Sequence, residues 1–593
     1  MARRKTSDKS IQTSVHPVAS NSDSDGLVAL SPLNKEGAAQ VAQAPEDDPR
    51  RVLTEEEAYA VLGFNFPVWK KWWIITSVFI VQLSMNFNAA IYGSAVPGFK
   101  AEFGTSHARS MLGMMVFLIL YAFGCELWAP WSEELGRWPI MQASLSLVNV
   151  WQFGNGFARS FTYILVFRAL GGLSSAGGSV TLGMVADMWE PEDQQYAVAY
   201  VVLSSVAGSV IAPIAGGFIQ TYLPWEWVFW ISLIFGAVAQ LFHAFTPETR
   251  ASVLLDREAK RRRKLGRLTP STLRPWTNLL TSATGIDPNI YGPNEIEGPL
   301  AKRIFTMHSL KLMFRPYKFL GTEPIVLFLS LLSGFADALI YVGLESFGLV
   351  MGRWNFTAIQ TGLSFISILL GYIVAYAIFM PRYYYDRKMM QETPDKCTPE
   401  RRLWLLLWLG PLMPIGLLIW SFGAFGPPDV HWIVPLIGAF LIGVANFAIY
   451  MATIDYMIAA YGPFAASATG GNGFCRDLLA GVSAPATRPL YENIANGTKW
   501  QLTAPSLILT AIGVLLTIPV YVFYYYGAWF RKRSPYAQEL EQVRAEKRPQ
   551  RKEAIAGAES RKTTPTNSRP ASRSTSPTRV VDRNELSIEP IGA

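Results

Sequence analysis

The sequence predicts an all-α integral membrane protein in which twelve transmembrane helices form two six-helix halves. Three observations lead to this fold class. Half of the 593 residues are hydrophobic and only 16% are charged, whereas about a quarter are charged in ordinary soluble domains. The apolar residues form separate runs of about 20, the length that a helix needs to cross the hydrocarbon core. A polar stretch divides these runs into two groups of six, which indicates two repeated halves.

Each predicted helix is bounded by polar residues or by Pro and Gly. Because lipid offers the backbone no hydrogen-bond partners, every span should be helical. The first half, residues 71–246, has its spans near 72–96, 110–130, 139–157, 161–186, 198–221 and 226–246. The second half, residues 322–530, has them near 322–350, 356–381, 402–424, 431–452, 456–484 and 502–527.

Three polar regions flank these halves. Residues 1–70 and 531–593 are rich in Ser, Pro and charged residues, a composition that predicts a disordered N-terminal region and a disordered tail. Residues 247–321 form a basic central loop that contains the run REAKRRRKLGR. The first 70 residues lack the apolar core of a cleavable signal peptide, so we expect the first span to direct insertion.

The distribution of Lys and Arg predicts the orientation. The loops expected on the outer side are short and hold few bases, whereas the segments expected on the inner side hold the basic central loop and Lys70, Lys71, Arg137, Arg382, Arg387, Lys388, Arg401, Arg402, Arg531, Lys532 and Arg533. By the positive-inside rule, both termini and the central loop are cytoplasmic. The two N-x-S/T glycosylation sequons, at Asn355 and Asn496, fall in loops on the outer side, in agreement with this orientation. We expect the plasma membrane, with the vacuolar membrane as the alternative.

The short polar stretch WSEELGRWPI, residues 131–140, separates the second span from the third. Gly136 permits a tight turn there, and Pro139 suits the first turn of the next helix. Arg137 lies at a helix N-terminus, where the macrodipole disfavours a cation. We therefore expect a carboxylate, a lipid phosphate or the C-terminus of another helix to compensate it. The alternative is a solvated loop that follows the positive-inside rule.

The fifth span carries a stripe of small residues. Gly208, Ala212 and Gly216 recur every four residues, so one helix face is bare and a neighbouring helix can approach closely. Pro213 removes a backbone hydrogen bond and can bend the helix, and Gly217 extends the bare region. This pattern predicts a packing hinge, with simple helix packing as the alternative.

Charged and polar side chains within the spans are candidates for proton coupling or solute binding, because a charge at mid-bilayer costs several kcal/mol. Arg168 can hold a carboxylate or change partner as protons move, unless it extends toward the outer headgroups. Asn86 and Asn88 line a central cavity or bond to another helix. The complete set is Arg168, Glu126, Asp337, Glu345, Asn86, Asn88 and Tyr341.

The acidic members of this set have several interpretations. Asp337, Tyr341 and Glu345 are spaced four apart and so share one helix face, where a carboxylate can bind a cation or carry a proton; Glu345 is close enough to the outer end to be simply hydrated. Glu126 can pair with Arg168 or with Arg476. The adjacent residues Arg476 and Asp477 can neutralise each other.

Five stretches resemble motifs of the major facilitator superfamily, in the form found in fungal drug:proton antiporters. Residues 129–139 resemble its loop 2–3 signature, G-P-L-S-E-x-x-G-R-R-P, with Ala129, Trp131 and Trp138 as departures. The segment GSVIAPIAGG resembles the antiporter motif, with Ala212 in place of Gly. The segments FRALG, PETRASVLL and IYVGLESFG resemble motifs of spans 4, 6 and 7. The resemblance covers about residues 60–530.

This resemblance implies a major facilitator fold and a proton-coupled transporter that exports organic, cationic or amphipathic solutes such as drugs, toxins and polyamines. A proton-coupled uptake transporter for a nutrient and a non-transporting receptor of the same fold are the alternatives. In the family, the loop 2–3 residues form a conformational latch. The matching residues here, with a degenerate counterpart after span 8, are Ser132, Glu133, Gly136, Arg137, Asp386 and Arg387.

The sequence contains no G-x-x-x-x-G-K-[ST] motif, which disfavours ATP-driven transport. It also shows no spacing typical of a metal site or a catalytic triad, so we predict no enzyme, no cofactor and no metal. The expected partners are a small-molecule solute, protons and the lipid bilayer. We expect no nucleic acid partner and a monomeric protein.

Overall fold

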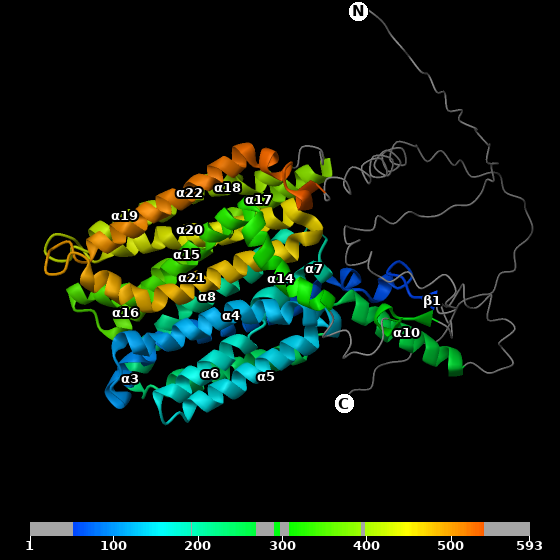
Figure 1. The fold of residues 1–593 in the computed structure, drawn as a ribbon, viewed down its shortest axis with the longest axis horizontal. Helices are drawn as coiled ribbons and strands as arrows, with labels where there is room; N and C mark the ends of the chain where they lie inside the picture. Colours follow the sequence, from blue (N-terminus) through cyan, green and yellow to red (C-terminus); the bar gives the residue numbers. More distant parts are fainter. Residues whose placement is uncertain (1–50, 191–192, 269–289, 297–306, 393–397, 539–593) are drawn as a thin grey trace, which may run out of the picture. The chain divides into compact units, whose positions relative to one another are not determined.

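The computed structural model describes residues 51–190, 193–268, 290–296, 307–392 and 398–538, and its long helices lie side by side (Figure 1). The first half begins with α2 (Val68–Ala90), which continues through η3 (Ile91–Ala95) into α3 (Val96–Phe103). It goes on with α4 (His107–Leu135), α5 (Arg137–Gly156), α6 (Phe161–Ser174), α7 (Gly177–Met188), α8 (Gln194–Tyr222) and α9 (Trp227–Ala244).

The second half repeats this plan. It comprises α15 (Pro324–Met351), α16 (Ala358–Ser364) with α17 (Ile366–Glu392), η7 (Pro399–Leu403) with α18 (Trp404–Leu409) and α19 (Leu412–Gly423), α20 (Ile433–Tyr461), α21 (Ala465–Asn493) and α22 (Thr503–Arg531). Successive spans alternate in direction, so the loops gather at two ends. We call the end where α4 meets α5 the latch end, and the end that carries the two sequons the sequon end.

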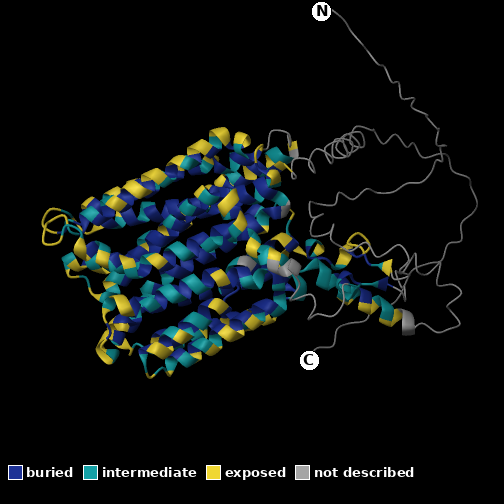
Figure 2. Ribbon diagram, viewed as in Figure 1, coloured by how far each residue is buried: buried dark blue, intermediate teal, exposed yellow. Residues whose placement is uncertain are grey.

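Within the described residues, nine helices are long and apolar enough to cross a membrane. The α5 helix, the interrupted pair α6 and α7, and the α21 helix complete the twelve predicted spans. The α5 and α21 helices are rich in small or polar residues, so hydropathy alone detects them poorly, and α6 is apolar but too short to qualify. Figure 2 shows exposed residues on the outer helix faces and buried residues between helices, and the exposed side chains include large apolar ones such as Trp408 and Tyr525. An apolar outer surface is what lipid contact requires.

The predicted boundary between spans 10 and 11 was wrong. The α20 helix runs to Tyr461 rather than ending near residue 452, and α21 begins at Ala465 rather than near residue 456. The sequence places the polar Asp455 in the turn, but this residue lies inside α20. Its carboxylate is buried and accepts hydrogen bonds from Arg402 at 3.0 Å and from Gln195 at 2.8 Å. Because these partners compensate its charge, Asp455 can lie inside the helix instead of in a turn.

A small module lies at the latch end, and we call it the terminal clip. It contains β1 (Arg51–Val52), η1 (Tyr59–Val61), η2 (Gly63–Asn65), α10 (Ala251–Leu268), β2 (Ile290–Tyr291) and α12 (Pro293–Ile296). The two strands pair in parallel, with Arg51 opposite Ile290. Its apolar core is formed by Leu53, Ala58, Leu62, Leu255, Ala259 and Ile290.

The clip differs from the expectation that residues 1–70 are disordered, because residues 51–65 form a strand and two short helices that pack on elements of the basic central loop. Leu53, Ala58 and Leu62 are too few to form a core alone, so the apolar pattern emerges only when the two regions pack together. Residues 1–50 of the predicted N-terminal region, and residues 539–593 of the predicted tail, lie outside the described residues.

Candidate functional site

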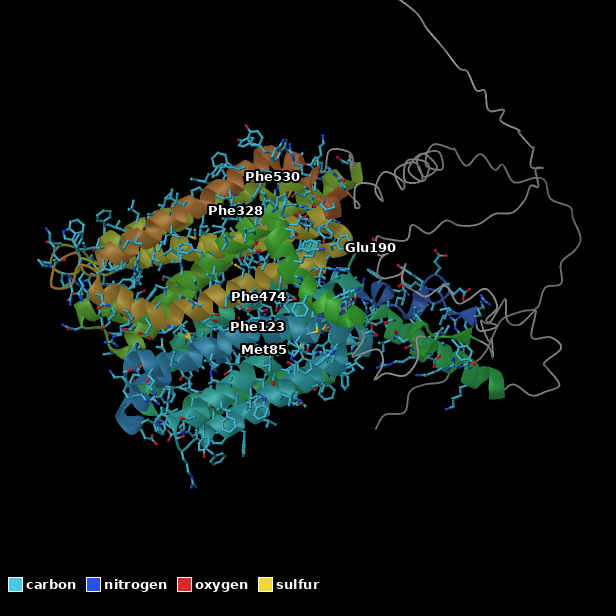
Figure 3. The ribbon with its side chains drawn as sticks, viewed as in Figure 1. Met85, Phe123, Glu190, Phe328, Phe474 and Phe530 are labelled. Atoms are coloured by element: carbon cyan, nitrogen blue, oxygen red, sulfur yellow. The ribbon has the colours of Figure 1, made fainter. Side chains whose placement is uncertain are left out.

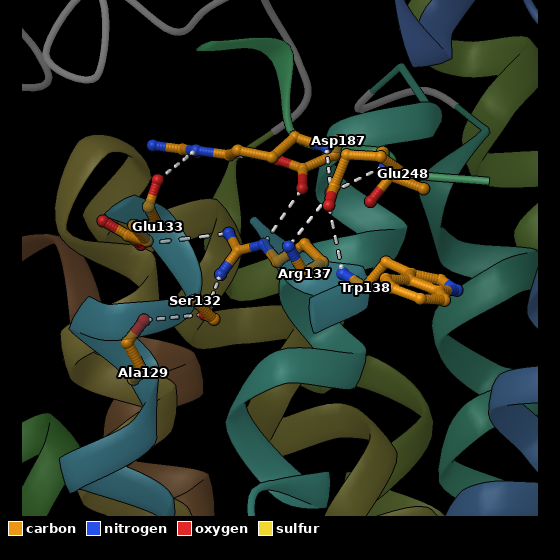
Figure 4. Close-up of polar contacts among 9 residues, drawn as sticks. Ala129, Ser132, Glu133, Arg137, Trp138, Asp187 and Glu248 are labelled. Carbon is orange, nitrogen blue, oxygen red and sulfur yellow. Dashed lines mark hydrogen bonds and ion pairs between the residues drawn. The ribbon is translucent and has the colours of Figure 1, made fainter. Parts of the chain in front are cut away.

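The latch loop is a compact network around Arg137 (Figure 4). The Arg137 side chain is buried, its Nε donates to Asp187 Oδ2 at 3.0 Å, and its Nη1 donates to Ser132 Oγ at 2.6 Å. Glu133 is more distant, at 3.9 Å from Nη2. The expected compensation of Arg137 is therefore a carboxylate, and Asp187 lies at the C-terminal end of α7, where the macrodipole also favours a cation.

A second carboxylate, Glu248, occupies the N-terminus of α5. It accepts hydrogen bonds from the backbone N–H groups of Arg137 at 2.9 Å and Trp138 at 3.2 Å, which satisfies donors that the first turn leaves free. Gly136 is the single residue between α4 and α5, with φ at +104°, and a Cβ there would collide with the Glu248 carboxylate. The turn therefore requires Gly both for its backbone conformation and for space.

The degenerate counterpart in the second half is built differently. Asp386 accepts a hydrogen bond from Arg382 Nε on its own helix at 3.1 Å. Arg387 reaches Asp193, which precedes α8 of the first half, at 2.8 Å. Nearby, Asp455 of α20 bonds to Gln195 of the first half. Of the two counterpart charges, Asp386 therefore stays paired within its own helix, whereas Arg387 connects the two halves.

The small-residue stripe of α8 packs against both halves. At Gly208, a Cβ would lie 2.6 Å from the carbonyl oxygen of Leu83 in α2, within the first half. At Gly217, it would lie 2.6 Å from the carbonyl oxygen of Ala358, the first residue of α16 in the second half. Gly216 faces Ser94 of η3, and Ala212 is fully buried. The α8 helix continues through Pro213 without a break.

Arg168 lies inside the first half with 1% of its surface exposed, so it does not extend to the headgroups. Its guanidinium donates to the carbonyl oxygens of Asn88 at 3.1 Å and Gly113 at 3.3 Å, and to Asn88 Oδ1 at 3.2 Å. The rings of Phe117 and Tyr92 face it at 4.0 and 4.8 Å. No ion pair of Arg168 with a carboxylate occurs among the described residues, so neutral groups alone hold this cation.

The two predicted asparagines connect helices. Asn88 Oδ1 also accepts from Gln152 of α5 at 2.6 Å, so it bridges that helix to Arg168. Asn86 donates to the Gln82 carbonyl oxygen at 2.9 Å and contacts Ser205 of α8 at 3.5 Å. Of the two interpretations, helix-to-helix bonding is the one that these contacts match.

A central charge cluster lies where the halves meet, and it consists of Glu126, Asp337, Arg476 and Asp477. Arg476 Nε lies 3.7 Å from Asp337 of α15, and Nη2 lies 3.6 Å from Asp477. The Tyr450 ring faces the guanidinium at 4.0 Å. Nε and Nη1 of Arg476 have no hydrogen-bond partner among the described residues. The mutual neutralisation of Arg476 and Asp477 is present, with Asp337 as an additional partner.

Glu126 comes from α4 of the first half and faces this cluster. Its side chain is buried, and its carboxylate lies against Gly470 of α21, where an added Cβ would be 2.7 Å away. Among the described residues it forms no ion pair with Arg168 or Arg476, the two partners that the sequence leaves open. Three carboxylates and one guanidinium therefore share this buried region.

The third predicted carboxylate of α15 is separate from the cluster. Glu345 lies near the sequon end and bonds to His107 Nε2 of α4 at 2.8 Å. His107 Nδ1 in turn lies 3.1 Å from Arg488 Nη1 of α21. Tyr341, between Asp337 and Glu345, is buried and interacts with Ser209 of α8. The predicted shared face exists, but its two carboxylates have different partners.

The two sequon asparagines, Asn355 and Asn496, are exposed in loops at the sequon end. Asn355 has a φ of +57° and precedes Thr357, whose hydroxyl caps α16 by accepting from the Gln360 N–H. Thr498, which completes the second sequon, bonds to the Ala495 carbonyl oxygen. Both asparagines lie at the end opposite to the latch.

Several residues of the site were missed at the sequence level. Asp187 and Glu248 complete the latch, and His107 joins the halves at the sequon end. Glu248 lies in the PETRASVLL stretch, so the motif itself could have indicated it. Asp187 is one of four acidic residues at positions 187–193, after the predicted span 4, so the sequence alone does not single it out. No local pattern announces His107, because its partner is 238 positions away.

The helix pairs, the latch at Arg137 and the buried charges at the junction of two repeated halves define the class of a polytopic secondary transporter. A family model for the Major Facilitator Superfamily matches residues 78–485. The chain belongs to the major facilitator superfamily and is a multi-pass membrane transporter.

Fungal relatives cover most of the chain. It is 29% identical over 480 residues to the MFS-type transporter kojT of Aspergillus flavus, which covers 79% of each chain. It is 28% identical over 486 residues to the multidrug transporter FLU1 of Candida albicans, which covers 80% of this chain and 74% of FLU1. The xylose transporter XylE from E. coli, in a partially occluded inward-open conformation, is similar in fold, with a TM-score of 0.50, 15% identity and 77% and 98% of the chains covered.

Proposed function

We propose that this protein is a proton-coupled antiporter that exports organic, cationic or amphipathic solutes by alternating access. The observation that carries the proposal is the central charge cluster. Glu126 belongs to the first half, whereas Asp337, Arg476 and Asp477 belong to the second. A group that binds between them is contacted by both halves and can be exposed to either side as the halves rock.

The charge balance of the cluster supports exchange of a proton for a cation. Asp337 and Asp477 face the Arg476 guanidinium, and Glu126 is a third buried carboxylate at this junction of the halves. A buried negative charge without a partner is costly. Either a proton or a positively charged solute can neutralise the excess negative charge. The two cannot bind to the same carboxylate at the same time. Binding of one therefore favours release of the other, and the Tyr450 ring offers a cation–π surface.

The remaining features fit such a cycle. The halves are in contact at both ends, through Arg387 and Asp193 at the latch end and through His107 and Glu345 at the sequon end. We place the latch end and both termini in the cytoplasm, the sequon end outside, and the monomeric protein in the plasma membrane. FLU1, described as a multidrug transporter, supports export of organic solutes.

The proposal is tested by transport in proteoliposomes. The protein is reconstituted, a fluorescent cationic dye is supplied, and a pH gradient is imposed that would drive export from the latch end. We expect dye flux against its gradient, and its loss when an ionophore collapses the pH gradient. Undiminished concentrative transport after that collapse would refute proton coupling, and dye binding without any flux would indicate a receptor.

Variants measured in the same transport assay test the roles of individual residues. Glu126→Gln keeps the shape of the side chain but removes its charge, and we expect gradient-driven transport to fall at least tenfold while downhill dye movement persists. Glu392→Gln is the matched control, because that carboxylate is exposed and pairs with Lys388 on its own helix. Arg168→Ala is expected to abolish transport by removing the cation that joins α2, α4 and α6.

A further inference from the structure

The helix α14 (Met307–Thr322) lies at the latch end, directly before the membrane span α15. Only Glu323 separates the two helices, so α14 lies at the level where the span begins. Its inner side contacts both halves, because the Tyr317 ring is 6.2 Å from Phe123 of α4 and 4.8 Å from Phe474 of α21. The rings of Phe123 and Phe474, both labelled in Figure 3, are 5.1 Å apart. Tyr317 therefore packs across the seam between the halves.

The outward side of α14 exposes a cation, an aromatic ring and a second cation, and it adjoins the side with Tyr317, since the Phe314 ring lies 6.2 Å from the Tyr317 ring. Lys311, Phe314 and Lys318 are exposed, and their spacing of three and four residues places them on one helix face. Phe314 is 61% exposed, although Pro316 and Phe319 of the same helix are buried. A large ring exposed between two ammonium groups is unfavourable in water and favourable at a membrane surface, where the ring reaches the acyl boundary.

The charged residues of α14 are all positive. The segment 307–322 contains Lys311, Arg315 and Lys318 and no Asp or Glu. The nearest acidic residue along the chain, Glu323, faces inward, where it accepts hydrogen bonds from Tyr461 at 3.0 Å and Ser534 at 2.9 Å. Arg315 packs over the Phe464 ring at 5.3 Å. The two exposed lysines therefore have no carboxylate on their own helix to neutralise them.

We propose that the Lys311–Phe314–Lys318 face of α14 binds anionic phospholipid headgroups of the membrane that surrounds the transporter. The ammonium groups contact the phosphates while the Phe314 ring enters the boundary of the acyl region, as basic amphipathic helices do. An acidic protein would match the charges, but the position of α14 beside the start of a span favours lipid. Because Tyr317 bridges the seam, bound lipid holds α14 against both halves.

The binding is tested by lysine footprinting on the full-length protein in lipid nanodiscs. One set contains neutral phosphatidylcholine, and the other contains phosphatidylcholine with phosphatidylserine. Lysines are acetylated for a limited time and the rate at each site is read by mass spectrometry. In the anionic discs we expect Lys311 and Lys318 to react about fivefold more slowly, and about 1 M salt to remove this protection.

Internal controls separate headgroup binding from general surface charge. Lys260 and Lys264 are exposed on α10 of the terminal clip, and their rates should not differ between the two kinds of disc. Equal rates for Lys311 in both discs, or equal protection of Lys264, would overturn the proposal. Protection in neutral discs by a soluble poly-glutamate peptide, without protection by phosphatidylserine, would indicate an acidic protein partner instead.

A variant tests the part played by the ring. Phe314→Ser keeps both lysines, and we expect it to lose most of the protection in anionic discs because the helix face no longer enters the boundary region. Leu265→Ser is the matched control, since Leu265 is an exposed apolar residue of α10. If Phe314→Ser leaves the protection intact, the face is not inserted and the proposal fails. Footprinting requires no transport, so its outcome is independent of the proposed function.

Discussion

The two halves use corresponding charges in opposite ways. In the first half, Arg137 is buried and pairs with Asp187 of the same half at 3.0 Å. In the second half, Arg387 is partly exposed and pairs with Asp193 of the other half at 2.8 Å. In the alternating-access cycle that we propose, a bond within one half is kept in every state, whereas a bond between the halves must break when the latch end opens.

The two ion pairs are expected to contribute different free energies because one is buried and the other is partly exposed. Removing one partner of a buried ion pair leaves an uncompensated charge and costs about 3–5 kcal/mol. A solvent-exposed pair contributes about 0–1 kcal/mol, a value that thermal motion can overcome repeatedly during a transport cycle. The first half therefore has the stronger pair where rigidity is needed, and the second half has the weaker pair where movement is needed.

The largest expected effect is on Arg137. We expect Arg137→Ala to lower the free energy of unfolding by about 3–5 kcal/mol. Among the described residues, Asp187 then keeps an ion pair with Arg250 alone, at 3.6 Å, and Ser132 loses its donor. The measurement is thermal unfolding of the purified protein in detergent. The comparison between the halves fails if Arg387→Ala, as its matched control, destabilises the protein by a similar amount.

Two glycines of α8 allow the same comparison to be made for packing, because one contacts its own half and the other contacts the second half. Gly208→Ala presses on Leu83 within the first half, and we expect it to cost about 1–3 kcal/mol of stability. Gly217→Ala presses on Ala358 of the second half, and separation of the halves at the sequon end can relieve that contact. We therefore expect a smaller loss of stability with a shift toward a form that is open at the sequon end. Equal losses of stability and no shift would contradict this assignment.

A smaller effect is expected at Arg387. Arg387→Ala should cost under about 1 kcal/mol of stability but raise the population that is open at the latch end. The buried thiols of Cys125 and Cys475, on α4 and α21 along the seam, report that opening without added cysteines. We expect their alkylation to be several-fold faster in the variant, as measured for each site by mass spectrometry. Unchanged rates would mean that Arg387 does not hold the seam.

Most of the fold was predictable because its signals are local. Apolar length gives the spans, and Gly136 and Pro139 mark the turn between two of them. The exceptions follow a physical rule. Asp455 suggests a turn because, taken alone, it is costly in lipid, and the structure shows it inside α20 with Arg402 and Gln195 as partners. A sequence shows that a charge is costly to bury, but it does not show which partner offsets that cost.

The candidate site was less predictable for the same reason. The sequence identifies Arg168 and Glu126 by their cost in lipid, yet it suggests carboxylate partners for Arg168, which is held by carbonyl oxygens and rings. The terminal clip was not expected either, since residues 51–62 and 251–296 are each too polar to indicate a core. Contacts between segments far apart in the chain decide both cases, and these have no local signature.

The smallest effect is expected in the terminal clip, where Glu295 of α12 pairs with Arg263 and, at 3.6 Å, with Lys260 of α10. Arg263 contacts Glu295 through two hydrogen bonds, at 2.6 and 2.7 Å. Burial opposes ionisation of Glu295, but the bonds from Arg263 and the Gly292 N–H outweigh it and lower the pKa of Glu295 below its usual value. A lowered folded-state pKa means that the stabilisation is present above the unfolded pKa and is lost as the pH falls through the folded value.

Hydrogen exchange at the Leu53 amide measures this contribution, because Leu53 N–H donates to the Tyr291 carbonyl oxygen at 2.9 Å beside the pair. After correction for intrinsic rates, we expect its protection to be constant near pH 6 and to fall below about pH 4. Glu295→Gln should show the lower protection already at pH 6, by an amount under about 1 kcal/mol because the pair is partly exposed. If the variant and the natural protein exchange alike at pH 6, the strand pairing depends on its apolar core alone. The ion pair of the clip would then differ from those of both halves. It would neither stabilise one rigid unit, as Arg137 and Asp187 do, nor connect two moving units, as Arg387 and Asp193 do.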